Sequence, residues 1–194
     1  MLGIFRHPHL VPLLAFCISS EDIGRFFALI YPLMSSSLED ALRLQRGADD
    51  ALLWSVRLSI ALDAAAGLAY LHSSEDKPVI LHRDIKTANI LLDTENRARI
   101  SDVGLARPMD ARTSQTRGVG SFGYIDHTYL TTGEFGARSD VFSFGVVLLE
   151  LLTGEAASDS TKRPPILHAR VGARLPRDAA VVADPRARLP TPVA

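Results

Sequence analysis

A short polar stretch near the middle of the chain carries the side chains that could do chemistry. It reads His82-Arg83-Asp84-Ile85-Lys86-Thr87-Ala88-Asn89. Asp84 supplies a carboxylate that could accept the proton of an attacking hydroxyl group, and Lys86, two residues later, supplies a cation. Asn89 follows with an amide oxygen that could ligate a metal ion, and Asp102 begins the later run Asp102-Val103-Gly104. Hard oxygen ligands of this kind suit Mg²⁺ better than a soft metal.

Each of these residues has an ordinary structural interpretation when it is taken alone. An isolated aspartate in a loop is usually a turn former. Lys86 could be a surface charge, and His82 could be a packed histidine. The ordered set, with apolar strands on both sides, favours the functional interpretation.

The pattern H-R-D-x-x-x-x-N followed by D-x-G resembles the large lobe of a eukaryotic protein kinase, and in detail the plant receptor-like serine/threonine kinases. A second matching stretch runs from Ser139 to Gly154, which predicts a buried helix in which Asp140 anchors the backbone of the catalytic loop. The resemblance implies an α+β, protein-kinase-like fold. It would consist mostly of the helical large lobe, with the hinge and a remnant of the small-lobe sheet.

The resemblance also implies catalytic roles. Asp84 would be the catalytic base, or would orient the substrate hydroxyl, and Lys86 would lie near the γ-phosphate of ATP. Asn89 and Asp102 would bind Mg²⁺. Ser121 takes the place of a residue that bonds to the catalytic aspartate, and a lysine at position 86 is typical of serine/threonine kinases.

A nucleotide site follows from the same resemblance. The adenine of ATP would bond to backbone groups of the hinge near Pro32 and Met34, with Tyr31 in the gatekeeper place. Leu91 would form the apolar floor beneath the adenine. Lys86, Asn89 and Asp102 would face the phosphates and their metal ion.

The chain departs from the family pattern at several points. Val103 replaces the usual Phe, and Asp126-His127-Thr128 replaces Ala-Pro-Glu. No G-x-G-x-x-G occurs in the first 80 residues, and the first lysine is Lys77. Residues 107–129 resemble an activation segment in which Arg83 and Arg117 could meet a phosphate; the candidate phosphosites are Thr113, Ser114 and Thr116.

Periodicity predicts the elements that position these groups. Residues 26–31 form a compact apolar strand, a further strand begins near Leu13, and residues 38–44 form a short helix. The clearest helix runs from Asp50 to His72, with an apolar stripe that includes Ile60, Ala64, Leu68 and Leu71. Arg57 and Asp63 lie off that stripe, so we expect them to be solvated.

Composition limits the remaining possibilities. The 194 residues suggest one domain with a substantial core, and a net charge of −1 gives no general attraction to nucleic acid or to an anionic membrane. The single Cys17 excludes an internal disulfide framework. No apolar run approaches the ~20 residues of a membrane span. These observations favour a cytoplasmic protein. The resemblance to receptor-like kinases implies protein substrates and association with the plasma membrane through a receptor complex.

Residues 1–155 are predicted to form a partial kinase domain, and residues 156–194 a degenerate or weakly ordered segment. Three functional interpretations stay open. The chain is a serine/threonine kinase that is competent within a longer product, a non-catalytic interaction module, or a fragment without function. The sequence encoded upstream of Met1 would distinguish them.

Overall fold

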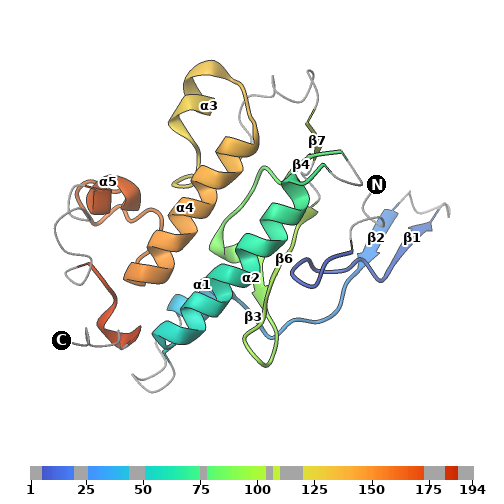
Figure 1. Cartoon of the computed structure of the whole chain (residues 1–194), viewed down its shortest axis with the longest axis horizontal. Coiled ribbons are helices and arrows are strands. Elements are labelled where there is room, and N and C mark those ends of the chain that lie inside the picture. Colours follow the sequence, from blue (N-terminus) through green and yellow to red (C-terminus); the bar gives the residue numbers. More distant parts are fainter. Residues whose placement is uncertain are drawn as a thin grey trace.

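Two long helices lie side by side and run in opposite directions through the centre of the molecule (Figure 1). They are α2 (Trp54–His72) and α4 (Ala137–Thr153). The computed structural model describes residues 6–19, 26–43, 51–74, 78–103, 107–109, 120–172 and 182–187. The main hydrophobic core lies between these helices, the short helix α1 (Leu38–Arg43) and a small sheet; its largest buried members include Leu38, Ile60, Leu71, Ile90, Leu92 and Ile100.

Helix α2 buries the predicted stripe but differs from the prediction at two points. It begins at Trp54, after the extended residue Leu53, and the predicted start at Asp50 lies outside the described residues. The expectation that Arg57 and Asp63 are solvated is wrong, because their side chains are buried. Both are fully paired, and a buried charge is tolerated when it has partners.

Glycine in α2 permits a close approach of the N-terminal segment. A Cβ atom built on Gly67 would lie 2.5 Å from the backbone oxygen of His9. The segment continues alongside β6 (Ala98–Ile100), where Val11 N donates to the Ile100 carbonyl at 2.9 Å and Ile100 N donates to the His9 carbonyl at 2.9 Å. The absence of a side chain at Gly67 therefore lets residues 9–11 lie between α2 and the sheet.

The strands form three small antiparallel sheets. A three-stranded sheet has the order β3 (Ser36–Ser37), β5 (Ile90–Leu92) and β6. β4 (Ile80–Leu81) leads into the candidate catalytic loop and pairs with β7 (Arg107–Pro108), which follows β6 in the sequence. The 3-10 turn η3 (Thr87–Asn89) leads from that loop into β5.

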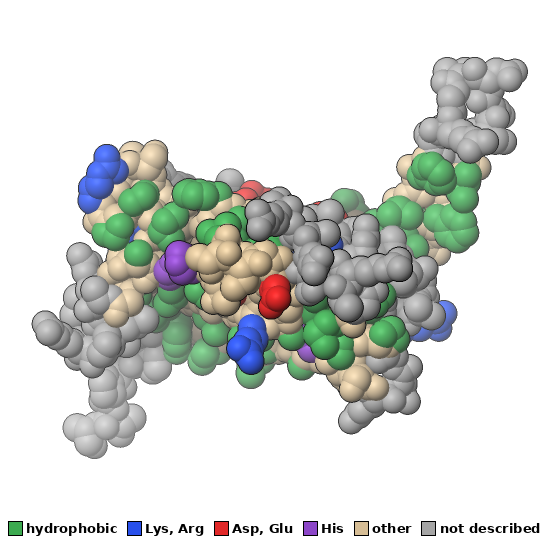
Figure 2. Space-filling model, turned by 90° about the horizontal axis from the view of Figure 1, so that it is seen from above, with side chains coloured by type: hydrophobic (Ala, Val, Ile, Leu, Met, Phe, Trp, Pro, Cys, Tyr) green, Lys and Arg blue, Asp and Glu red, His purple; other side chains and the backbone are tan. Residues whose placement is uncertain are grey.

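The third sheet is a hairpin that projects from the rest of the molecule (Figure 1). β1 (Ala15–Ser19) pairs with β2 (Phe26–Ile30), so that Phe16 faces Leu29 and Ile18 faces Phe27. Alternation in a strand places these four side chains on one face, and all four are exposed. Figure 2 shows hydrophobic side chains gathered on this projection.

Helix α4 is stopped by Gly154, whose φ of 67° is in the left-handed region that favours glycine. Its N-cap is Gly136, and Ser139 Oγ accepts the Gly136 N–H at 3.4 Å. The remaining helices are α3 (His127–Thr132) and α5 (Leu167–Gly172), with the 3-10 turn η7 (Pro185–Ala187). α5 and η7 lie within the predicted segment 156–194, and the predicted boundary at residue 155 stays a prediction. Among the described residues, no helix is long and apolar enough to cross a bilayer.

Candidate active site

Asp140 holds the backbone of the loop that carries the candidate catalytic residues. It lies completely buried in the first turn of α4. Its Oδ2 accepts the backbone N–H of His82 and its Oδ1 that of Arg83, both at 2.8 Å. His72, at the end of α2, brings its Nε2 within 2.9 Å of the same Oδ2. The predicted anchoring by Asp140 is therefore confirmed, and it fixes the loop to both long helices.

The Asp84 carboxylate is the point at which three other side chains meet. Lys86 Nζ donates to Asp84 Oδ2 at 2.7 Å, and Asn89 Nδ2 donates to the same oxygen at 3.0 Å. Ser121 Oγ donates to Asp84 Oδ1 at 2.8 Å and accepts from Lys86 Nζ at 2.9 Å. The fold thus brings together four residues that the sequence singles out, although Ser121 lies 37 positions after Asp84.

These contacts also set the ionisation of the carboxylate. Burial alone would raise the pKa of Asp84, but the hydrogen bonds from Lys86 and Ser121, the lysine charge and the Asn89 amide outweigh burial and hold the pKa below its ordinary value. The carboxylate is therefore ionised near neutral pH. An ionised, oriented carboxylate can accept a proton from a hydroxyl group that reaches it.

Two residues beside these groups have unusual backbone conformations. Arg83 has a φ of 75° and Asp102 a φ of 54°, in the region that favours glycine. Such conformations persist where surrounding contacts enforce them, and they concentrate at functional sites. For Arg83 the contacts are Asp140 and the ring of Phe135, whose centroid lies 5.9 Å from the guanidinium carbon.

Asn89 and Asp102 lie at the same end of the β5–β6 pair. Ser101, next to Asp102, donates its backbone N–H to the Asn89 carbonyl at 2.8 Å. The Asn89 amide nitrogen donates to the Asp84 carbonyl at 2.8 Å as well as to its carboxylate. Within the described ranges no hydrogen bond reaches the amide oxygen of Asn89, so this atom can bind a ligand, and the Asp102 side chain is exposed. One amide oxygen and one carboxylate fit Mg²⁺, which completes its shell with water and substrate phosphates.

No group of three or more His, Cys, Asp or Glu side chains gathers as a metal site in the part of the chain that the structure describes. A magnesium ion shared with a nucleotide does not require one.

The predicted nucleotide residues lie on neighbouring segments. Pro32 and Met34 are half-buried in the connection between β2 and β3. Leu91 is half-buried on β5, where it pairs with Ser37 of β3. Ser35 N donates to the Leu92 carbonyl at 2.8 Å, which joins the end of the hinge to the same strand.

A cavity of about 290 Å³ opens beside Lys86 and Ser121. Its other walls come from α1, through Glu39 and Arg43, and from residues 156–158 after α4. Tyr124 also lines it. The cavity therefore adjoins the groups that hold the Asp84 carboxylate.

Glu150 joins three of the segments around this cavity. It is completely buried on α4. Its carboxylate accepts the Tyr124 hydroxyl, Arg43 Nη2 at 2.5 Å and the Ala157 N–H at 3.1 Å. Burial raises the pKa of Glu150 more than these partners lower it, and burial together with Glu150 raises the pKa of Tyr124. The Tyr124 hydroxyl also lies 3.0 Å from Thr87 Oγ1, directly after Lys86.

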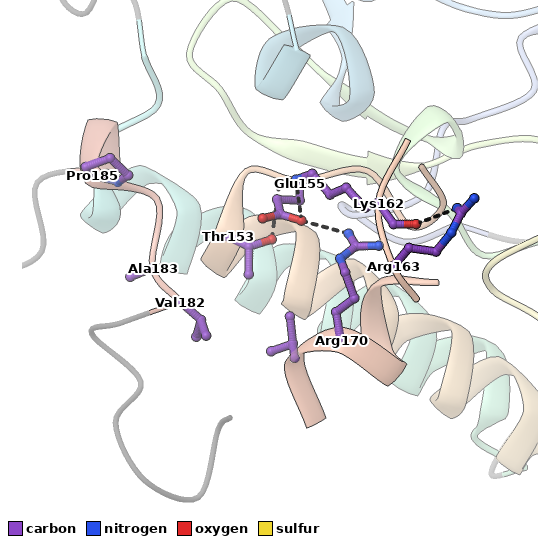
Figure 3. A pocket seen from close by; sticks show the side chains of 9 residues that line it. Thr153, Glu155, Lys162, Arg163, Arg170, Val182, Ala183 and Pro185 are labelled. Atoms are coloured by element: carbon purple, nitrogen blue, oxygen red, sulfur yellow. Dashed lines mark hydrogen bonds and ion pairs between the residues drawn. The ribbon is translucent and has the colours of Figure 1, made fainter. Parts of the chain in front are cut away.

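A larger cavity of about 470 Å³ lies away from these groups, between α5 and residues 182–185 (Figure 3). Glu155, Lys162 and Arg170 point toward one another at its edge (Figure 3). Glu155 Oε2 lies 2.8 Å from Lys162 Nζ and 2.7 Å from Arg170 Nη2. Burial opposes ionisation of Glu155, but these cations hold its pKa below the ordinary value. The ion triad of one carboxylate and two cations connects α5 to the end of α4.

Some predicted residues lie outside the description and some contributors were missed. The candidate phosphosites Thr113, Ser114 and Thr116, with Arg117, lie outside the described residues. The sequence analysis did not identify the contacts of Glu150, although Glu150 is the only charged residue between Val141 and Thr153. A lone charge in an apolar helix is a signal of a buried, paired group.

Sequence comparison finds similar proteins that are named serine/threonine-protein kinases. Probable serine/threonine-protein kinase PBL8 of Arabidopsis thaliana is 49% identical over 165 residues, 83% of this chain and 38% of that protein. Serine/threonine-protein kinase BIK1 of the same plant is 47% identical over 166 residues, 83% of this chain and 40% of that protein. An EPD1-interacting receptor-like cytoplasmic serine/threonine-protein kinase 5D of Gossypium barbadense is 49% identical over 167 residues, 84% of this chain and 35% of that protein. The chain thus spans about two fifths of the length of such relatives.

The sequence model of one family, described as protein tyrosine and serine/threonine kinase, matches residues 1–183. This match covers the hinge, the loop around Asp84 and both long helices. Together with the geometry at Asp84, it leads to one conclusion: the chain belongs to the protein tyrosine and serine/threonine kinase family.

Proposed function

We propose that this chain forms the catalytic large lobe of a protein serine/threonine kinase, which transfers the γ-phosphate of ATP to serine or threonine hydroxyls of protein substrates. The single observation that supports it best is the Asp84 carboxylate, held by Lys86, Asn89 and Ser121. The names of the relatives support the choice of serine and threonine as acceptors.

In this proposal Asp84 accepts the proton of the substrate hydroxyl, or orients it. Lys86 already donates to Asp84 at 2.7 Å, so its cation would lie beside the reacting oxygen and offset negative charge that develops there. Ser121 fixes the other carboxylate oxygen. Phosphoryl transfer depends mainly on positioning and charge neutralisation, and these three side chains can supply both.

Asn89 and Asp102 would hold Mg²⁺, and Pro32, Met34 and Leu91 would contact the adenine. The metal ion, when bound, supplies positive charge to the phosphates of ATP. The free amide oxygen of Asn89 and the exposed carboxylate of Asp102 are the observations that support this assignment. We further propose that the protein acts in the cytoplasm, in complexes with receptors at the plasma membrane.

A second candidate function is a binding module that has the large-lobe fold but does not transfer phosphate. Two departures from the family pattern favour it: Val103 replaces the usual Phe, and Asp126-His127-Thr128 replaces Ala-Pro-Glu. In protein kinases, the packing of the phenylalanine at the position of Val103 distinguishes active from inactive arrangements.

The test joins this chain to a kinase small lobe that carries the glycine-rich loop and the phosphate-binding lysine, and we call the product the extended kinase. Its phosphorylation of a generic basic protein with ATP and Mg²⁺ is followed by mass spectrometry. We expect phosphoserine and phosphothreonine. Predominant phosphotyrosine would contradict the proposed acceptor, and nucleotide binding without any transfer would favour the binding module.

A further inference from the structure

The cavity beside Lys86 and Ser121 is separated from a buried carboxylate by one charged side chain. Glu150 does not line the cavity, but the three groups that hydrogen-bond to it do, namely Arg43, Tyr124 and Ala157. Two of these partners are a neutral hydroxyl and a backbone amide. Arg43 is therefore the cation that both neutralises Glu150 and screens it from the cavity.

Arg43 is held in this position from two sides. Its Nη1 bonds to Glu39 one turn earlier on α1, and its Nη2 bonds to Glu150 across the molecule. About a third of the Arg43 side chain stays exposed, whereas Glu150 is completely buried. A carboxylate in such a place needs a cation, because an unpaired buried charge is strongly unfavourable. The chain supplies that cation itself.

The cavity lies where a protein substrate would bind, an inference that rests on the proposed kinase function. A protein substrate whose hydroxyl reaches Asp84 must pass Lys86 and Ser121, which form one wall of the cavity. The side chain of a nearby substrate residue can then enter it. That side chain would meet Arg43, not the carboxylate behind Arg43.

We propose that Arg43 is a specificity-determining residue, which keeps Glu150 from binding a basic substrate side chain and so makes the cavity unselective for arginine or lysine. Removal of the Arg43 side chain opens Glu150 to the cavity. The vacated position then suits the guanidinium of a substrate arginine, because a charge-assisted pair with a buried carboxylate is strong. Arg43→Ala should therefore convert an unselective cavity into one that selects a basic residue.

The test measures peptide binding to the full chain, which requires no phosphate transfer. One peptide series carries a central serine in an alanine background, with a single arginine moved through the three positions on each side. A matched series carries glutamine in place of arginine. Dissociation constants come from fluorescence anisotropy. The unmodified chain should bind the two series within about threefold, and Arg43→Ala should bind one arginine peptide about tenfold or more tightly than its glutamine match.

Two double variants identify the carboxylate responsible. Arg43→Ala with Glu150→Gln should lose the gain, whereas Arg43→Ala with Glu39→Gln should keep it. Arg163→Ala removes an exposed arginine outside this cavity, so this variant should bind the two peptide series with the same dissociation constants as the unmodified chain. If Arg43→Ala does not fold, as judged by circular dichroism, Arg43→Ser also vacates the position beside Glu150 and should show the same gain.

Three results would overturn the proposal: tenfold arginine selectivity in the unmodified chain, no gain in a folded Arg43 variant, or no measurable binding of any peptide. The proposed phosphate transfer is tested separately in the extended kinase. A chain with the predicted peptide selectivity but no transfer would contradict the proposed function and leave the role of Arg43 intact.

Discussion

At the scale of single residues, the hydrogen bond between Ser121 and Asp84 connects two segments that lie far apart in the sequence. The Ser121 hydroxyl donates to Asp84 Oδ1, while Lys86 and Asn89 donate to Oδ2. Each donor stabilises the ionised carboxylate. The carboxylate is therefore oriented before any substrate arrives, which is how an enzyme reduces the reorganisation needed during reaction.

Removal of the Ser121 hydroxyl tests this orientation. Ser121→Ala in the extended kinase should lower kcat by about 10- to 150-fold, because a hydrogen bond to a charged group contributes ~1.5–3 kcal/mol. Nucleotide affinity should be unchanged. Ser121→Thr keeps the hydroxyl and should retain most of the activity. Steady-state kinetics with a serine peptide gives both numbers. Equal kcat for the alanine variant and the unmodified protein would show that Ser121 does not position Asp84.

At the scale of elements, the buried ion pair between Arg57 and Asp184 connects α2 to the segment before η7. Arg57 Nη2 lies 2.7 Å from Asp184 Oδ2, and Arg57 also donates to the carbonyls of Leu52 at 2.8 Å and Leu151 at 2.7 Å. Arg186 bonds to the same carboxylate. One arginine thus joins the start of α2, the end of α4 and a late part of the chain.

Loss of the carboxylate should therefore be costly. Asp184→Ala leaves Arg57 buried without its counter-charge, and we expect the free energy of unfolding to fall by ~3–5 kcal/mol. Glu134→Ala, at an exposed glutamate, should change it by less than ~0.5 kcal/mol. Urea unfolding followed by circular dichroism measures both. Similar small effects for the two variants would mean that the pair does not stabilise the fold.

The same carboxylate gives a pH dependence with a definite sign. Burial opposes ionisation of Asp184, but Arg186 and Arg57 outweigh burial and lower its pKa. Its contribution to stability is then complete above the unfolded pKa of ~3.9 and is lost as pH falls through the lower folded value. Below about pH 4 the unmodified chain should lose stability more steeply than Asp184→Asn. An equal loss of unfolding free energy in the two proteins as pH falls would contradict this pH dependence.

The sign of the stability change caused by alanine at Gly67 tests how closely the His9 backbone approaches α2. Alanine normally stabilises a helix interior relative to glycine by ~0.5–1 kcal/mol. At Gly67 the new Cβ would lie 2.5 Å from the His9 oxygen, so Gly67→Ala should instead destabilise the protein by ~1–3 kcal/mol. Gly145 in α4 has no neighbour within 4 Å of its ideal Cβ, and Gly145→Ala should stabilise. Chemical denaturation compares the two variants, and stabilisation by both would contradict the close approach.

These elements also show what the sequence could and could not predict. The 3.6-residue period located α2 and its buried stripe, and local turn signals located the end of α4 at Gly154. The burial of Arg57 and Asp63 could not be predicted from periodicity, because their partners Asp184 and Arg97 are distant in sequence. Of the hydrogen bonds to Asp84, the sequence implied only the one from Ser121, through the resemblance to the kinase family. The Arg43–Glu150 pair depends on tertiary structure.

At the scale of the whole molecule, many large apolar side chains are exposed among the residues that the structure describes. Four of them share one face of the β1–β2 hairpin, namely Phe16, Ile18, Phe27 and Leu29. Others lie on the long helices, such as Leu62 on α2 and Val141 and Leu148 on α4. Extended apolar patches are unusual on a soluble monomer. Each 100 Å² left uncovered forgoes about 2.5 kcal/mol, against a total stability of ~5–15 kcal/mol for a typical domain.

We therefore expect the isolated chain to be marginally stable, to bind hydrophobic dyes and to self-associate or need a partner. Replacement of Phe16 and Phe27 by threonine should reduce dye fluorescence and self-association, because both rings lie on the exposed hairpin face. Dye titration and analytical ultracentrifugation measure these effects. A monodisperse monomer without dye binding, which melts cooperatively above ~65 °C, would contradict the expectation.

The most direct test of the central claim compares the extended kinase with its Asp84→Asn variant. The asparagine keeps the shape of Asp84 but cannot accept a proton as a carboxylate does, and general base catalysis typically contributes ~10²–10⁴-fold. Transfer of the γ-phosphate to a serine peptide is measured alongside nucleotide affinity. We predict a loss of transfer of at least ~10²-fold with nucleotide affinity nearly unchanged. An Asp84→Asn variant as active as the unmodified protein would contradict the assignment of Asp84 as the catalytic residue.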